Sequence, residues 1–198
     1  MNTLKVQKRT KDEKPKRLRR EGFITGNLFG KKIDGSIMLK FDRQEAEKAL
    51  KGCVKGSQIN LDLEGKKYDV LIKEIGYDAI KRQTLEIDFQ ALVSTEKSRT
   101  TAEIILTNKD KIKAGVLDQS LSEISYTALP KDMVDKVEYD VSTMQPGDEI
   151  KVSDLSIASN KKISLQTSLD TVVATLFVPH ASATTETETE ETAETSEE

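Results

Sequence analysis

Five basic side chains lie within seven positions near the start of the chain: Lys14, Lys16, Arg17, Arg19 and Arg20. A guanidinium group offers a planar fork of N–H donors that matches the oxygens of a phosphate and the edge of a guanine base. A cluster of this kind is typical of proteins that bind a nucleic-acid backbone. It is equally typical of a solvated, flexible loop, and composition alone does not decide between the two interpretations.

The net charge of −3 is distributed unevenly along the chain. Residues 1–93 contain 21 Lys and Arg against 14 Asp and Glu, a net charge of +7, whereas residues 94–180 contain 10 against 13, a net charge of −3. Residues 181–198 contain seven Glu and no basic residue, a net charge of −7. The basic first half predicts a polyanionic partner for that half alone.

The inventory of side chains argues against catalysis and metal binding. The chain has one cysteine, Cys53, and one histidine, His180, so a zinc site built from Cys and His ligands cannot be assembled. His180 follows Pro179 at the start of the acidic tail, which is a poor place for the rigid base of a catalytic triad. Phosphate-binding Walker and dinucleotide-binding glycine motifs do not occur. We therefore expect a protein that is not an enzyme and that needs no cofactor or metal.

The same inventory predicts a cytoplasmic protein. Residues 1–6 do not resemble a signal peptide, and no apolar run approaches the roughly 20 residues of a membrane span. A single cysteine cannot form an internal disulfide, which agrees with a reducing compartment. We expect neither a membrane nor a small-molecule substrate among its partners.

Strands dominate the elements that must position the basic cluster. Alternating apolar and polar residues predict strands at 2–7, 23–30, 36–41, 59–63, 68–72 and 85–91. Asp42, with Glu45 three residues later, has the spacing of a capping box and predicts a short helix that stops at Gly52. The stretch 8–20 has one large apolar residue, Leu18, and is interpreted as a long mobile loop with at most a helical turn. Each strand has one apolar face, which predicts an antiparallel β-barrel with a polar outer face.

The second half continues with short strands. They are expected near 104–106, 124–128, 137–141, 150–152 and 163–165, followed by a central strand at 172–178 that is apolar on both faces. Pro146 and Gly147 suit the centre of a type II turn. The chain is thus predicted to be mainly β. We expect a basic, polyanion-binding barrel with one or two short helices at 1–93, a linker at 94–99, a second all-β domain of sandwich or barrel type at 100–180, and a disordered acidic tail at 181–198.

Several short motifs occur in a familiar order. The first half contains R-L-R, V-L-I-K-E-I and I-D-F, and the second contains A-L-P, Y-D-V-S and G-D. From about residue 3 to 179 the chain resembles large-subunit ribosomal protein number twenty-five in its long form, also called general stress protein CTC. The resemblance implies a cytoplasmic, ribosome-associated protein that binds 5S ribosomal RNA through its N-terminal barrel. The near-neutral to acidic second domain would then contact a neighbouring ribosomal protein or project into solvent.

The resemblance also implies individual site residues. The family's basic loop falls on Arg9, Lys16, Arg17 and Arg19, the carboxylate of its I-D-F strand falls on Asp88, and Phe29 stands where the family has a tyrosine. With the neighbouring basic side chains, the expected RNA-binding set is Arg9, Lys14, Lys16, Arg17, Arg19, Arg20, Phe29 and Asp88.

Departures from the family pattern leave two hypotheses open. Thr25 replaces a proline, Asn27 an aliphatic residue, Gly76 a glutamine and Glu86 a histidine. The retained basic residues favour a structural component of the large subunit that binds 5S ribosomal RNA. Glu86 places a negative charge where RNA is expected, which favours a ribosome-associated stress protein or a protein–protein adaptor with weakened RNA binding.

Overall fold

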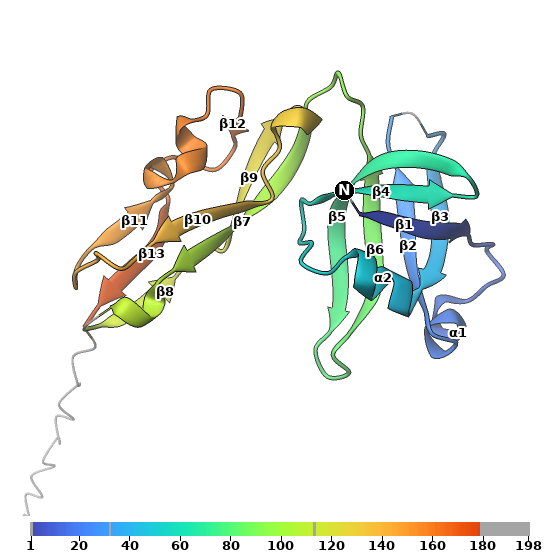
Figure 1. The fold of residues 1–198 in the computed structure, drawn as a ribbon, viewed down its shortest axis with the longest axis horizontal. Coiled ribbons are helices and arrows are strands. Elements are labelled where there is room, and N and C mark those ends of the chain that lie inside the picture. Colours follow the sequence, from blue (N-terminus) through green and yellow to red (C-terminus); the bar gives the residue numbers. More distant parts are fainter. Residues whose placement is uncertain (1, 32, 113, 179–198) are drawn as a thin grey trace, which may run out of the picture.

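The computed structural model describes residues 2–31, 33–112 and 114–178, and it contains two β regions joined by one connection between strands β6 and β7 (Figure 1). The mainly β fold class expected from the sequence is confirmed. His180 and the segment 181–198, for which disorder was predicted, lie outside the described residues.

The first region is a closed barrel of six strands in the order β1-β3-β2-β6-β5-β4. The strands are β1 (Thr3–Lys8), β2 (Phe23–Phe29), β3 (Ser36–Asp42), β4 (Gln58–Leu63), β5 (Lys66–Asp78) and β6 (Gln83–Ala91). Four neighbouring pairs are antiparallel as expected, but β1 pairs with β4 and β2 with β6 in parallel. Closure removes free strand edges, so this region has no exposed backbone ladder among its described strands.

The core of the barrel follows from the alternation read in the sequence. Ile24 and Leu28 of β2 point inward with Ile87 and Phe89 of β6, and all four are buried. Phe89 also contacts Phe41 of β3, with ring centroids 6.0 Å apart in a tilted arrangement. The residues that alternate with these core positions along each strand point outward and form the polar outer face of the barrel. The apolar face therefore fixes which side chains are left for a partner.

The prediction for 8–20 is a long mobile loop with at most a helical turn, and the structure has a short helix in its second half. Helix α1 (Pro15–Arg20) forms there and packs against β2, with Leu18 buried (Figure 1). Pro15 occupies the first helical turn, where its missing N–H costs nothing. Arg43 donates a hydrogen bond from Nη2 to the Arg19 carbonyl oxygen at 3.2 Å. One buried leucine and contacts from distant residues order a segment that its own composition would leave disordered.

Helix α2 (Arg43–Ala49) begins as the sequence predicts. The Asp42 carboxylate accepts hydrogen bonds from the backbone N–H groups of Gln44 at 2.8 Å and Glu45 at 3.1 Å. Ala46 faces the barrel core and is buried. The chain then leaves the helix through Gly52, whose φ of +80° suits glycine.

The second region consists of two small sheets with the strand orders β10-β7-β9-β12 and β11-β13-β8. The strands are β7 (Ser98–Thr107), β8 (Val116–Gln119), β9 (Glu123–Ala128), β10 (Lys136–Asp140), β11 (Glu149–Lys151), β12 (Ser164–Leu165) and β13 (Val172–Phe177). Four 3₁₀ turns connect them, namely η1 (Lys109–Lys111), η2 (Pro130–Asp132), η3 (Val152–Asp154) and η4 (Ser156–Ser159). Strand β13 is central in its sheet, as expected, whereas β8 was not predicted, and β7 begins at Ser98, inside the expected linker.

The turn at Gln145–Asp148 confirms the expected type II geometry. Asp148 N donates to the Gln145 carbonyl oxygen at 3.0 Å, and Gly147 has a φ of +102°, the left-handed conformation that this turn requires. It delivers the chain into β11 beside β13.

The two regions contact each other directly. Lys55 forms an ion pair with Glu123 at 3.0 Å, and Gln58 Nε2 donates to the Pro130 carbonyl oxygen at 2.6 Å. Leu71 of β5 alternates with core residues and so points out of the barrel, yet it is 0% exposed. The hollow beside Leu71 is lined by residues of β7, which explains its burial.

Candidate nucleic-acid interface

Helix α1 presents most of the predicted basic cluster to solvent. Lys14, Lys16, Arg17 and Arg20 are all exposed. The Arg17 side chain is 81% exposed and forms an ion pair with Glu21 at 2.8 Å, a hydrogen bond that raises the pKa of Arg17. A surface pair of this kind contributes little to stability, so Arg17 can exchange Glu21 for a phosphate at small cost.

Arg19 differs from its neighbours because it is half-buried and held by the barrel. Its Nε donates to the Leu85 carbonyl oxygen at 3.2 Å, and its Nη2 lies 3.4 Å from Thr25 Oγ1 and 3.2 Å from Glu86 Oε2. Arg19 therefore has a structural role in addition to its place in the predicted RNA-binding set. Its guanidinium bridges α1 to β2 and β6, which places the helix beside the outer face of the barrel.

Glu86 does lie on the outer face, but its charge is paired with Arg19. Gly76 is its partner across the β5–β6 ladder. A Cβ atom added at Gly76 would lie 2.8 Å from Glu86 Cγ, closer than side chains tolerate. The two departures from the family pattern are therefore coupled: Glu86 as placed leaves no space for a side chain at position 76.

The outer face beside Arg19 is polar and fixed. Asn27 of β2 pairs in register with Asp88 of β6, and Asp88 Oδ1 accepts from Asn27 N at 3.2 Å and Asn27 Nδ2 at 3.0 Å. Glu74 of β5 lies across from Asp88 on the other side. Phe29 is half-buried at the far end of β2, four residues beyond Thr25, or about 13 Å along the strand. The structure brings Asp88 close to the Arg19 anchor and leaves Phe29 at the opposite end of the same face.

The segment before α1 is tied to the barrel through Glu13. Its carboxylate forms an ion pair with Lys40 of β3 and accepts from Thr10 N at 3.1 Å. Arg9 Nη1 donates to the Glu13 carbonyl oxygen at 3.0 Å. The hydrogen bond from Lys40 is the largest cause of a lowered pKa of Glu13, with that from Thr10 next. Arg9 is thereby held at the border between the loop and the outer face.

A hollow of about 510 Å³ lies between α1 and the β5–β6 hairpin. Three residues of the predicted cluster meet there, namely Lys16, Arg19 and Arg20, and Lys81 from the hairpin turn faces them. Sequence reasoning missed Lys81. The adjacent basic pair Lys81-Arg82 in a hairpin turn was a signal, but only the fold shows which basic helix it faces.

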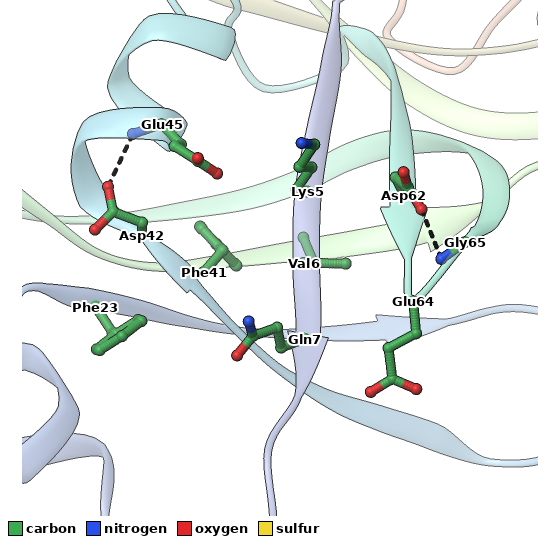
Figure 2. A pocket seen from close by; sticks show the side chains of 10 residues that line it. All are labelled: Lys5, Val6, Gln7, Phe23, Phe41, Asp42, Glu45, Asp62, Glu64 and Gly65. Carbon is green, nitrogen blue, oxygen red and sulfur yellow. Dashed lines mark hydrogen bonds between the residues drawn. The ribbon is translucent and has the colours of Figure 1, made fainter.

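A second hollow, of about 460 Å³, has the opposite character. Its lining includes four carboxylates, those of Asp42, Glu45, Asp62 and Glu64 (Figure 2). Asp42 caps α2, and Asp62 Oδ1 accepts from Gly65 N at 2.9 Å in the β4–β5 turn. These two carboxylates hold backbone N–H groups, and the acidic lining makes this hollow unsuited to phosphate.

Within the part of the chain that the structure describes, no group of three or more His, Cys, Asp or Glu side chains is placed to hold a metal ion. The helices of that part are too short to span a membrane.

The structure thus defines a two-region β protein whose basic helix is anchored beside the polar face of a closed barrel. The sequence profile of the Ribosomal L25p family matches residues 4–89, and that of the C-terminal domain of ribosomal protein TL5 matches residues 97–180. These two matches cover the barrel and the second region respectively.

Curated relatives match the chain over most of its length. The chain is 32% identical over 177 residues to the large ribosomal subunit protein bL25 of Geobacillus thermodenitrificans, covering 88% of this chain and 83% of the relative. It is 30% identical to bL25 of Bacillus pumilus, covering 96% and 92%, and 32% identical to bL25 of Clostridium tetani, covering 77% and 80%. The chain belongs to the bL25 family of ribosomal proteins, in the form with a TL5-type C-terminal domain. It is a family of structural, non-enzymatic proteins.

Proposed function

We propose that this protein is a structural component of the large ribosomal subunit, in the cytoplasm, and that it binds 5S ribosomal RNA without catalysis. The observation that carries the proposal is the anchored position of α1. Arg19 fixes α1 next to a polar barrel face. The helix exposes Lys16, Arg17 and Arg20, and Lys14 is exposed at its N-cap. The curated relatives bear the name of a large-subunit protein, which supports the assignment.

The two parts of the surface would do different work. Lys14, Lys16, Arg17 and Arg20 neutralise phosphates, which supplies affinity and makes it depend on salt. The barrel face carries acceptors such as the Asp88 carboxylate, which bind 2′-hydroxyl groups and exocyclic amines in the shallow minor groove of an RNA helix. The second region, which lacks such a basic cluster, would contact a neighbouring ribosomal protein or project into solvent.

Binding and co-sedimentation test the proposal together. The full-length protein should bind 5S ribosomal RNA more tightly than a transfer RNA of similar length, with log Kd rising linearly with log salt. The native protein should also sediment with large subunits from cell extract. Equal affinity for both RNAs, or a protein that stays at the top of the gradient, would contradict the proposal.

An adaptor or stress factor with weakened RNA binding is the second candidate, and one observation favours it. Three carboxylates, those of Glu74, Asp88 and Glu86, stand side by side on the outer face, and Glu86 already occupies the Arg19 guanidinium. Under this alternative the protein would sediment with ribosomes through protein contacts, and purified 5S ribosomal RNA would not compete it off.

A further inference from the structure

The β5–β6 hairpin extends past the end of the barrel, and its tip is built to stay in one conformation (Figure 1). Asp78 Oδ1 accepts from Ile80 N at 3.0 Å and from Lys81 N at 3.1 Å. Arg82 takes the left-handed conformation with a φ of +50° and turns the chain into β6. Ile80 at the tip is 95% exposed. A turn that is held by these hydrogen bonds and exposes an aliphatic side chain at its tip indicates a contact surface and not only a connection between strands.

One side of the hairpin is cationic. Lys81 lines the hollow opposite Lys16 and Arg20, and the lining carboxylate, Asp78, is hydrogen-bonded to two backbone N–H groups. Arg19, the fourth cation, is held by Glu86 and the Leu85 carbonyl oxygen. The three side chains that are not held, Lys16, Arg20 and Lys81, converge on one space from two separate elements.

The other side of the hairpin carries an aromatic ring. Tyr77 pairs with Thr84, and because it directly precedes Asp78, which lines the hollow, it points to the opposite side of the hairpin. It is 58% exposed. The paired Thr84 is too small to cover the ring. An exposed ring next to a hairpin that lines a cationic hollow suits stacking on an unpaired base.

We propose that the β5–β6 hairpin is a second RNA-contacting element. A phosphodiester segment enters the hollow between α1 and the hairpin and is held by Lys16, Arg20 and Lys81, while Tyr77, on the other side of the hairpin, stacks on an unpaired base. This inference rests on the proposed function, because it assumes RNA beside α1. Its content is separate: it assigns recognition to a turn outside the basic cluster and predicts an unpaired nucleotide at the binding site.

Charge and stacking can be separated by salt. Lys81→Ala should weaken binding of 5S ribosomal RNA about tenfold at 0.1 M salt and lower the slope of log Kd against log salt by about 0.7–0.9, the value of one phosphate contact. Lys66→Ala is the matched control, since Lys66 is an exposed lysine at the start of β5, at the far end of that strand from the hairpin turn that contains Lys81. It should leave both affinity and slope unchanged.

Tyr77→Ala should weaken binding about 5- to 100-fold with no change in the salt slope, because stacking releases no counterions. Tyr77→Phe retains the ring and should bind like the parent. Both residues are exposed, so circular dichroism should show intact folds. If the parent binds 5S ribosomal RNA while Lys81→Ala and Tyr77→Ala bind equally well, the hairpin inference is overturned and the proposed function stands. If the parent itself fails to bind, the proposed function falls and takes the inference with it.

Discussion

Aspartates accept backbone hydrogen bonds in both the barrel and the second region, whereas basic residues are distributed differently in the two. In both, aspartates hold turns: Asp42 and Asp62 in the barrel, and Asp148 and Asp154 in the second region, accept from nearby backbone N–H groups. Basic side chains gather on α1 in the first region, whereas in the second they are scattered and one, Lys162, is paired with Asp132 at 3.0 Å. The four basic residues of α1 therefore supply more than half of the net charge of +7 in residues 1–93.

The two regions also differ in how much each depends on the other. The barrel is closed and keeps its own apolar cluster, while the second region is two small open sheets around another. Their junction buries Leu71 of the barrel, and a Cβ atom at Gly56 would lie 1.9 Å from the Thr101 carbonyl oxygen. The backbones approach so closely there that the junction acts as a packed interface. The regions therefore have separate cores but are joined by several direct contacts.

Removing the basic cluster, which distinguishes the barrel from the second region, should have the largest effect on RNA binding. We expect Lys16→Ala, Arg17→Ala and Arg20→Ala together to lower affinity for 5S ribosomal RNA by up to about a thousandfold at 0.1 M salt, since each phosphate contact contributes about tenfold there. The fold should be retained because all three side chains are exposed. Binding curves at several salt concentrations test this. A control triple variant of Lys131, Lys151 and Lys161 in the second region should bind as the parent does.

Disturbing the junction should show how far the stability of the barrel depends on the second region. Leu71→Ala should lower the free energy of unfolding of the full chain by about 2–5 kcal/mol, as for other buried leucines. Residues 1–93 alone, which we propose form a separate domain, should fold with Leu71 exposed, and Leu71→Ala should then cost less than about 1 kcal/mol. Urea titrations of the four proteins provide the measurement. An equal loss in fragment and full chain would show that Leu71 belongs to the barrel core.

The coupled pair on the outer face should give an intermediate effect. Gly76→Ala should destabilise the barrel by about 1–2 kcal/mol, because the new Cβ meets Glu86 Cγ. In the background of Glu86→Ala the same substitution should be nearly neutral. A double-mutant cycle by thermal unfolding measures the coupling. Additive effects would mean that Glu86 moves aside without cost.

Glu86→His tests the same pair in RNA binding. Losing the carboxylate removes a negative charge from the face and frees Arg19, so affinity for 5S ribosomal RNA should rise, most clearly at low salt where charge is least screened. Glu86→Gln serves as the control that removes the charge without adding an imidazole. If neither variant binds more tightly, the Arg19–Glu86 pair does not oppose RNA.

Protonation of Glu13 should give the smallest effect, confined to the segment before α1. Its pKa is lowered in the folded protein, so the stability it contributes is present above the ordinary value of 4.5 and is lost as pH falls through the lowered pKa. The protection factor of the Leu18 amide, which corrects for the slower intrinsic exchange in acid, should therefore fall as pH is lowered. Glu13→Gln should exchange faster at neutral pH and lack that acid-dependent step, and identical profiles for both proteins would contradict the assigned role.

The features that depend on residues close together in the sequence could be predicted from the sequence alone. The barrel strands followed from alternation, the start of α2 from Asp42, and the turn at Pro146 and Gly147 from their backbone preferences. The basic cluster and its charge contrast were also plain. Each of these is set by residues a few positions apart, for which local stereochemistry and side-chain polarity suffice.

The order of the basic segment depends on contacts that appear only in the folded protein. Leu18 is a single apolar residue among charged ones in the sequence, and it is buried only because it packs against the barrel. Arg19 is held by Leu85 and Glu86, which are 66 and 67 residues away. Lys81 joined the cluster only because the β5–β6 hairpin folds back toward α1. Leu71, which local alternation assigns to the outer face, is buried by the second region. Ordering a polar segment requires free energy from contacts distant in sequence, and local pattern carries no record of those contacts.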